Sequence, residues 1–380
     1  MTSNDDKLRI AFIGARGVGN SYSGIETYYE EVGSRLAARG HEVTAYCRSY
    51  FTPETDSYRG IRVRRLPSLR SKHLETLSHS VLSTFDALFR GYDIVQFHAL
   101  GSAPLSILPR ICGQKTVVSV RGLDWQRAKW GRLARWVLQT GEWASVRLPS
   151  GTSVVSETLR DHYRAVHGRE TTVIRNAVVP AEPRSIDRIA AYGLESDGYL
   201  LYVGRISPEK GIHTLLEALR PLPRTKKLVL AGGSSYSDSY IQSVKEMAWD
   251  EVVFLGKVDH ETIEELLSNC YAFILPSSIE GLSIALLEAL SFGTCILTTS
   301  IPENLEVVGE TGVVFPPEDV EALQERLRAI LESPELVQQH RDLVTERARG
   351  WPDWDEVAEQ TEEFYRRLVT NGPSSTRLAG

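Results

Sequence analysis

The chain has 380 residues, 42% of them hydrophobic, and a net charge of −6, so it is long enough for two or three domains with full cores. Its four cysteines, Cys47, Cys112, Cys270 and Cys295, form no C-x-x-C pair, which argues against a zinc site or a disulfide scaffold. Residues 1–7 are acidic rather than apolar, and no stretch approaches the ~20 apolar residues that cross a bilayer, so we expect a cytoplasmic protein.

The first half of the chain predicts a parallel, doubly wound sheet. An apolar strand at residues 9–14 ends in glycine, a helical pattern covers residues 25–39, and a second strand follows at residues 41–46. This β-α-β opening is typical of a Rossmann-like domain. Short apolar segments predict further strands at residues 92–98, 116–120 and 152–155.

The strand series starts again after a linker at residues 180–184, which contains two prolines. Five apolar segments predict strands at residues 199–204, 227–232, 252–255, 272–275 and 295–298. A charged amphipathic pattern then predicts a helix over residues 355–368. We therefore expect two Rossmann-like domains, at residues 1–182 and 183–352. A C-terminal helix should follow at residues 353–370, and a disordered tail at residues 371–380.

Glu280 and Glu288 frame the most informative segment of the chain. Ser283 is a natural N-cap for a short apolar helix over residues 284–292, and Gly293 is placed to end it. The free amides at the helix start suit an anion, while a carboxylate on an apolar helix needs partners such as sugar hydroxyls. The segment predicts a ligand made of a sugar joined to a phosphate, bound with the help of Gly281, Leu282 and Ser283.

A basic loop follows the first strand of the second half of the chain. It places Arg205 and Lys210 at the carboxyl end of that strand, where open α/β sheets bind ligands. Two cations there would neutralise a diphosphate leaving group. The alternative is a solvated basic loop.

In the first half, the glycine-rich segment at residues 14–19 reads GxxGxG, and no acid follows the second strand, so NAD binding is not favoured. Gly24 stands before a predicted helix, where its amide suits a phosphate, although a turn alone would also need glycine. His98 ends a strand at the sheet edge that also holds Gly14, which favours a functional role over a structural one.

The charge is divided unequally along the chain. Residues 1–180 contain 25 Lys and Arg against 16 Asp and Glu, whereas residues 181–380 contain 18 against 33. The basic half predicts an anionic partner, either nucleic acid or a membrane surface, unless the two halves simply attract each other. Residues 62–72 and 127–135 are its densest basic stretches. In the second stretch tryptophans alternate with cations, which is typical of an interfacial segment, unless those tryptophans belong to the core.

Together these segments resemble the family-4 retaining glycosyltransferases of the GT-B fold. The resemblance is carried by Ser23-Gly-Ile-Glu26, Val95-Gln-Phe-His98, Gly204-Arg…Lys210-Gly211 and Glu280-Gly-Leu…Glu288, and it extends over residues 8–370. Residues 116–131 resemble the bacterial exopolysaccharide and capsule branch, including rhamnosyltransferase-like members. The resemblance implies two domains that face each other across a cleft, with the C-terminal helix crossing back to the first domain.

The resemblance also implies roles for the candidate residues. Glu280 would face the hydroxyls of the donor sugar, and Glu288 would hold the ribose. Arg205 and Lys210 would bind the diphosphate in place of a metal, with no cofactor needed. Gly24 and the Leu282 amide would complete the phosphate cradle, and His98 would contact the sugar or the acceptor.

Some positions depart from the family pattern. Leu282-Ser283 replaces Phe-Gly, and Arg121 replaces a histidine common near the third strand. The reaction class stands, whereas the donor sugar and the acceptor stay open. Arg121, with Asp124 nearby, suggests an anionic acceptor.

The resulting prediction is a retaining hexosyltransferase in cell-surface polysaccharide biosynthesis. Its partners would be a nucleotide sugar, a carbohydrate or lipid-linked acceptor, and an anionic membrane surface on which it lies peripherally, rather than nucleic acid. Two alternatives stay open: a sugar-nucleotide epimerase of the same fold, which would need no acceptor, and a non-catalytic sugar- or nucleotide-binding protein, which would release no nucleotide.

Overall fold

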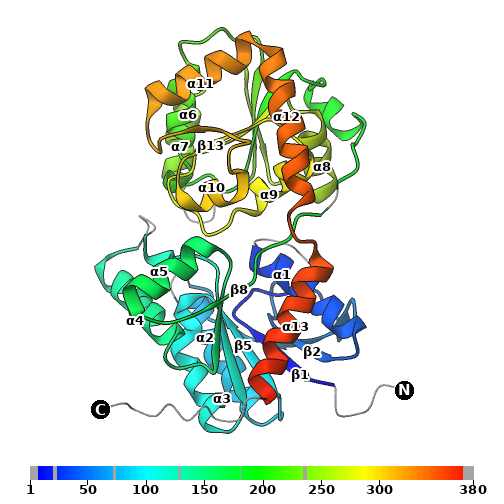
Figure 1. Cartoon of the computed structure of the whole chain (residues 1–380), viewed down its shortest axis with the longest axis vertical. Coiled ribbons are helices and arrows are strands. Elements are labelled where there is room, and N and C mark those ends of the chain that lie inside the picture. Colours follow the sequence, from blue (N-terminus) through cyan, green and yellow to red (C-terminus); the bar gives the residue numbers. More distant parts are fainter. Residues whose placement is uncertain are drawn as a thin grey trace. The chain divides into compact units, whose positions relative to one another are not determined.

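The computed structural model describes residues 7–19, 24–71, 74–126, 130–179, 181–233 and 238–370. The chain forms two compact units, each built on a parallel sheet covered by helices (Figure 1). The first unit holds Met1–Asn176 and Trp354–Gly380, and the second holds Ala177–Asp353. The predicted α/β fold of two doubly wound domains is confirmed. The expected tail, residues 371–380, lies outside the described residues.

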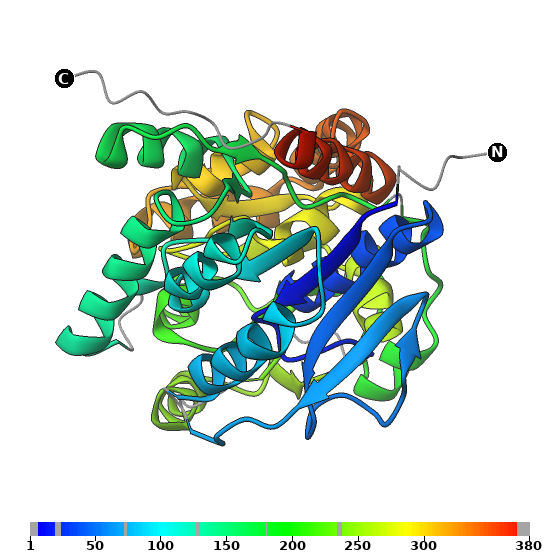
Figure 2. The ribbon, with the colours of Figure 1, turned by 90° about the horizontal axis from the view of Figure 1, so that it is seen from below.

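The first unit contains an eight-stranded sheet with the order β3-β4-β2-β1-β5-β6-β7-β8. Apart from their first residues, β1 and β2 are buried, and they lie side by side (Figure 2). All pairs are parallel except β3 with β4. The strands are β1 (Arg9–Ile13), β2 (Glu42–Arg48), β3 (Ser57–Tyr58), β4 (Ile61–Leu66), β5 (Ile94–His98), β6 (Lys115–Val120), β7 (Gly151–Val154) and β8 (Thr172–Val173).

The helices of the first unit cover both faces of this sheet. Because parallel crossovers are right-handed, the strand order places α1 on one face and α2 to α5 on the other. The terminal helix α13 packs against α1 (Figure 1), where the hydroxyls of Tyr28 and Thr361 lie 3.3 Å apart. The helices are α1 (Gly24–Ala38), α2 (Glu75–Leu88), α3 (Ile107–Ile111), α4 (Arg132–Ser145), α5 (Glu157–His167) and α13 (Trp354–Thr370), with 3-10 turns η2 (Leu100–Ser106) and η3 (Asp124–Gln126).

The second unit contains a six-stranded parallel sheet with the order β11-β10-β9-β12-β13-β14. Its strands are β9 (Tyr199–Val203), β10 (Lys227–Ala231), β11 (Val252–Gly256), β12 (Ala272–Leu275), β13 (Ile296–Thr299) and β14 (Val313–Phe315). Its helices are α6 (Ile212–Leu219), α7 (Asp238–Met247), α8 (His260–Asn269), α9 (Ile284–Ser291), α10 (Pro302–Val308), α11 (Val320–Glu332) and α12 (Pro334–Arg349), with 3-10 turns η4 (Arg188–Tyr192) and η5 (Pro208–Lys210).

Each sheet has a point where the strand order reverses, between β1 and β5 in the first unit and between β9 and β12 in the second. Ligands of open α/β sheets bind at such points, beyond the carboxyl ends of the strands. Two glycines with positive φ lie there. A Cβ on Gly14 would lie 2.4 Å from the His98 carbonyl oxygen, and one on Gly211 would lie 2.2 Å from the Pro276 carbonyl oxygen. Both close approaches therefore require glycine.

Candidate active site

The predicted site residues are divided between the two units. Arg205, Lys210, Glu280, Glu288 and the segment of residues 281–283 belong to the second unit. The first unit holds Gly24, His98, Arg121 and Asp124. Each set follows the carboxyl ends of strands at or next to the switch point of its sheet, where the strand order reverses.

In the second unit, the loops after β9 and β12 are joined by a buried ion pair. Lys210 Nζ lies 2.5 Å from Glu280 Oε1, and the two side chains are only 12% and 8% exposed. A backbone hydrogen bond from the Ser278 amide to the Glu209 carbonyl, 3.0 Å long, ties the same two loops. The structure therefore brings together two residues that the sequence places in separate motifs.

Arg205 lies in the same loop and is half-buried. Its carbonyl accepts a 2.7 Å hydrogen bond from the Tyr202 hydroxyl, which anchors the loop to β9. Among the described residues, its guanidinium has no acidic partner within salt-bridge distance. The charge beside the switch point is thus available for a ligand.

The start of α9 has the predicted cap. The Ser283 hydroxyl accepts from the Leu286 amide at 3.4 Å, and Gly293 follows the helix with φ of 61°. The first-turn amides and the positive end of the helix dipole therefore lie directly after Glu280, at the carboxyl edge of the sheet. Such an N-terminus favours a negatively charged group.

Glu288 lies on the second turn of α9 and is half-buried. Burial raises the pKa of its carboxyl group to about 7; His260 opposes this shift and Glu264 adds to it. Within the described part of the chain, its carboxylate oxygens accept no hydrogen bond. A ligand that offers two hydroxyls would satisfy them.

In the first unit, His98 is completely buried in a hydrogen-bonded chain. The Tyr365 hydroxyl of α13 donates to Gln96 Oε1 at 2.5 Å, and Gln96 Nε2 lies 2.9 Å from His98 Nε2. The amide group of Gln96 therefore donates to His98 Nε2, which leaves the proton on Nδ1. Burial, and secondly the charge of Arg121, lower the pKa of His98 well below its ordinary value. His98 is thus a neutral hydrogen-bond donor at physiological pH.

Of the other candidates of the first unit, Arg121 is the one that lies close to His98. Arg121 follows β6, donates from Nη1 to Asn176 Oδ1 at 2.5 Å, and lies 4.0 Å from the centre of the Tyr28 ring. Gly24 is the first residue of α1, and Asp124 begins the turn η3. Residues 20–23, which precede Gly24 and include part of its motif, lie outside the described residues.

A metal-ligand type of cluster lies elsewhere in the first unit. Glu142, His162 and His167 bring one ligand atom each within 4.8 Å of one another. Both imidazole Nε2 atoms lie 2.8 Å from Glu142 Oε1, and Trp125 Nε1 donates to Oε2 at 2.6 Å. The carboxylate is thus fully supplied with donors from the protein, and the cluster fastens the η3 turn to α4 and α5.

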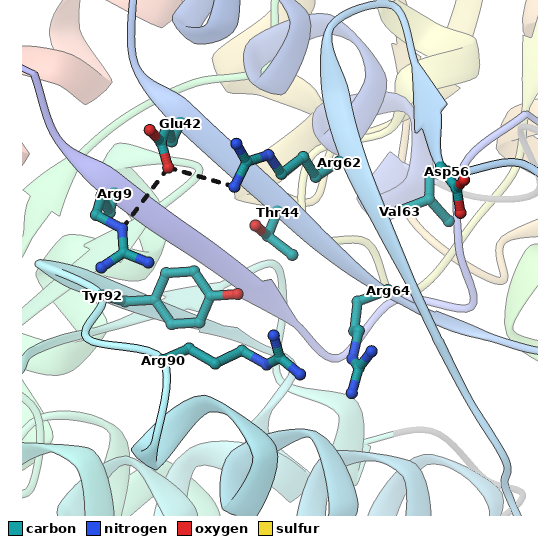
Figure 3. Close-up of a pocket in the computed structure, with 9 residues that line it drawn as sticks. All are labelled: Arg9, Glu42, Thr44, Asp56, Arg62, Val63, Arg64, Arg90 and Tyr92. Atoms are coloured by element: carbon teal, nitrogen blue, oxygen red, sulfur yellow. Dashed lines mark hydrogen bonds and ion pairs between the residues drawn. The ribbon is translucent and has the colours of Figure 1, made fainter.

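A polar pocket of the first unit lies away from the switch point (Figure 3). Arg9, Glu42 and Tyr92, which line it, belong to the starts of β1, β2 and β5, at the opposite end of the sheet from His98. Glu42 is 3.4 Å from Arg62 and 3.7 Å from Arg9, so its charge is already paired. We assign this pocket no part in the site.

Each half of the chain matches the model of a glycosyltransferase family. The model of Glycosyltransferase Family 4 matches residues 22–182, and that of Glycosyl transferases group 1 matches residues 187–351. Glycogen synthase of Mycobacterium tuberculosis is 33% identical over 244 residues, 62% of this chain and 58% of that protein. The chain spans a little over half the length of the curated relatives that it first matches.

Solved structures match the chain along almost its whole length. Sucrose-phosphate synthase from Thermosynechococcus elongatus has a TM-score of 0.82 at 25% identity, covering 96% of this chain and all of that one. Anabaena Alr3699/HepE in complex with UDP-glucose has a TM-score of 0.79 at 16% identity, covering 95% of this chain and all of that one.

Proposed function

We propose that the chain is a glycosyltransferase of the GT-B fold that transfers a hexose-type sugar from a nucleotide-diphosphate sugar to an acceptor with retention of the anomeric configuration. The observation that carries this proposal is the buried Lys210–Glu280 pair at the switch point of the second sheet, beside Arg205 and the start of α9. The UDP-glucose bound by Alr3699/HepE supports a nucleotide sugar as donor.

The cations act on the leaving group. As the bond between the sugar and the diphosphate breaks, negative charge grows on the departing phosphate oxygens. Lys210, Arg205 and the first amides of α9 are donors held in place before the reaction, which is the arrangement that stabilises a transition state most. Glu280 compensates the charge of Lys210 until the diphosphate arrives, and the contact holds the lysine in position.

The two glutamates of the segment accept hydrogen bonds from hydroxyl groups. Glu280, 8% exposed and next to the diphosphate site, would hold the donor sugar. Glu288, one helical turn further on, would hold the ribose of the nucleotide. The Glu288 carboxylate, which accepts no hydrogen bond from the described residues, would be stabilised by accepting two such bonds.

The acceptor hydroxyl loses its proton as its oxygen bonds to the sugar carbon. His98 is a poor base for this proton, because its Nε2 already accepts from Gln96 and its pKa is low. The departing diphosphate oxygen can take the proton instead. Entering and leaving oxygens then share one face of the sugar, which is compatible with retention.

The outer surface of the first unit supports a lipid-linked acceptor at an anionic membrane. On α2 the amphipathic pattern is reversed: the buried residues include His79, Ser80, Ser83 and Thr84, whereas Phe85 and Phe89 are 53% and 87% exposed. Leu77 and Leu82 are also exposed on this helix. A large apolar face turned to solvent indicates a binding surface.

Helix α4, on the same face of the sheet, adds aromatic and basic groups. Leu133 and Trp136 are 76% and 63% exposed, so Trp136 is not a core residue. Arg132 and Arg135 are exposed and form no ion pair with the described residues. Of the other cations in the two basic stretches, Arg64 is paired with Asp86, and Lys72, Arg127 and Lys129 lie outside the described residues.

Among the described helices, none has the length and apolar character needed to cross a membrane. We propose a peripheral contact, in which the apolar face of α2 enters the interface while the arginines of α4 meet anionic headgroups. An acceptor saccharide carried on a lipid diphosphate, as in cell-surface polysaccharide synthesis, would be presented there.

An epimerase is not favoured. Such an enzyme needs a free acid and a free base, whereas Glu280 of the second unit is held by Lys210 and His98 of the first unit is a neutral donor. A non-catalytic binding protein would release no nucleotide, so a measurement of nucleoside diphosphate release distinguishes it from the proposed enzyme.

The proposal is tested with Lys210→Ala and Arg205→Ala. We expect kcat/KM for nucleoside diphosphate release from a panel of nucleotide sugars to fall by roughly 10²–10³, the cost of losing one donor to a developing charge. Lys226→Ala and Arg224→Ala are matched controls, because these cations lie before β10, at the opposite end of the sheet. Parent rates in both site variants would refute the assignment.

A further inference from the structure

Arg121 is a cation for which the described residues provide no counter-ion. The protein surrounds it, and only part of its surface stays accessible. Among the described residues it has no acidic partner; its contacts are the Asn176 side-chain oxygen and the Tyr28 ring. Its Nε atom is buried and has no hydrogen-bond acceptor. Burial lowers the pKa of the guanidinium to about 10, opposed only by tyrosines.

This arrangement is costly, and another buried arginine of the same unit avoids it. A buried charge is destabilising unless a partner compensates it. Arg48 is a buried arginine of the same unit, and its guanidinium lies 3.0 Å from the Glu75 carboxylate. Arg121 has only an amide oxygen and an aromatic face, which compensate a charge less well than a carboxylate does.

The groups beside Arg121 also lack an acceptor. His98 carries its proton on Nδ1, and this atom is buried without a partner in the described part of the chain. His98 is close enough to Arg121 for the charge to lower its pKa. The carboxyl edge of the first sheet therefore has an excess of positive and donor groups.

We propose that Arg121 binds an oxyanion of the acceptor, a phosphate or a carboxylate, and thereby selects an anionic acceptor. This inference rests on the proposed function and adds the residue that recognises the anionic group of the acceptor. A planar guanidinium suits both groups, because its parallel N–H bonds match two oxygens of either. The anion supplies the counter-charge that the protein withholds.

The experiment measures anion binding by calorimetry at low and high salt. Glucose 6-phosphate, glucuronate and neutral glucose serve as probes, in the background of Arg205→Ala/Lys210→Ala so that the diphosphate site does not contribute. Arg121→Gln removes the charge, and Arg121→Lys keeps it. Arg164→Gln is the control, because Arg164 is an exposed arginine of the same unit, paired with Glu170 at 2.9 Å.

We expect Arg121→Gln to weaken binding of at least one anion by roughly 10- to 100-fold, the range for a hydrogen bond to a charged group. Arg121→Lys should retain part of the affinity, and Arg164→Gln all of it. Loss of glucose 6-phosphate alone identifies a phosphate, and loss of glucuronate alone identifies a carboxylate. Unchanged binding of both anions, or an equal loss of neutral glucose, overturns the proposal.

Thermal unfolding separates binding from a structural role. Because Arg121 lacks a counter-ion, Arg121→Gln should leave Tm unchanged or raise it; a clear fall in Tm with unchanged anion binding would make the residue structural. Donor hydrolysis distinguishes the two proposals. If Arg121→Gln changes nothing while Lys210→Ala abolishes nucleotide release, only this inference fails.

Discussion

Lys210 and Glu280 are 70 residues apart in the sequence, and their contact joins the loops after β9 and β12. Both residues could be predicted from the sequence, because each follows an apolar strand and precedes a helix. Their contact could not be predicted, since nothing in a linear pattern says that two strand ends are neighbours. The strand order of the second sheet supplies that information.

The surroundings of His98 were less accessible to sequence analysis. Gln96 lies in a buried strand, and Tyr365 lies 269 residues further on in the terminal helix. Tyr365 appeared in the sequence only as an apolar position of an amphipathic pattern. Its hydroxyl nevertheless determines the orientation of the Gln96 amide, and hence the tautomer of His98.

Glu288 should make both stability and nucleotide binding depend on pH. Its pKa rises from 4.5 to about 7 on folding, mainly through burial. The folded state therefore binds more protons than the unfolded state between these values, so the contribution to stability falls as pH rises through this window. We expect Glu288→Gln to reduce that fall, measured by urea unfolding at pH 5 and pH 7.5.

Nucleotide affinity should change in the opposite direction. The ionised carboxylate accepts ribose hydroxyls best, so binding of the nucleoside diphosphate by the parent should strengthen as pH rises through about 7. In Glu288→Gln this increase should be lost, while the exposed-site control Glu346→Gln should keep it. An identical pH profile in Glu288→Gln and parent would remove Glu288 from the nucleotide site.

At the scale of elements, sequence patterns succeeded where one period dominated. The strands from β9 to β13, the cap of α9 and the β1-α1-β2 opening were predicted because apolar runs ended at glycine or serine. The strand β4 (Ile61–Leu66) was missed, since its three arginines looked like a basic stretch. In the structure they belong to a strand, and Arg62, Arg64 and Arg65 all form ion pairs.

The reversed pattern of α2 could not be predicted either, because a helical period does not say which face is buried. It leads to a test with vesicles. Phe85→Glu/Phe89→Glu should abolish co-sedimentation with phosphatidylglycerol vesicles, since it places charges on the apolar face. Arg132→Glu/Arg135→Glu should weaken it, because each arginine near an anionic surface contributes about 1 kcal/mol.

The controls are Leu343→Glu and Arg349→Glu, exposed positions of the second unit. We expect the parent and both controls to bind anionic vesicles, to be released by salt from them, and to ignore phosphatidylcholine. Absence of binding by the parent, or full binding by both surface variants, would contradict the membrane proposal. A parent dimer that Phe85→Glu/Phe89→Glu converts to monomer would instead identify α2 as an interface between copies.

At the scale of the whole molecule, the cations of the proposed donor site and those of the first unit lie in different halves of the chain. Its cationic donor groups, Arg205 and Lys210, lie in the acidic half, while the basic half carries Arg121 and the surface arginines of α4. The total charge of −6 therefore says little about binding partners, whereas the positions of individual arginines and lysines say more. Sequence composition predicted the asymmetry, but the separation into paired and unpaired arginines required the structure.

The proposed use of side-chain cations in place of a metal leads to a last prediction. Arg205, Lys210 and the start of α9 supply fixed positive charge where a divalent ion would otherwise meet the diphosphate. Sugar transfer, measured as nucleoside diphosphate release, should therefore persist in excess EDTA and respond little to added Mg²⁺ or Mn²⁺. The control is Lys210→Ala, which should be impaired equally with and without EDTA.

Complete loss of activity in EDTA, restored by Mg²⁺ or Mn²⁺, would contradict this prediction. The Asp353-Trp-Asp355 segment would then be the first place to search, because a D-x-D pattern can hold a metal beside a nucleotide sugar. Its geometry favours another role: Asp355 lies in the first turn of α13, and its carboxylate is 3.0 Å from Arg35 of α1. An acid at that position stabilises the helix start and fastens α13 to the first unit. Asp355→Asn should accordingly leave activity in EDTA unchanged.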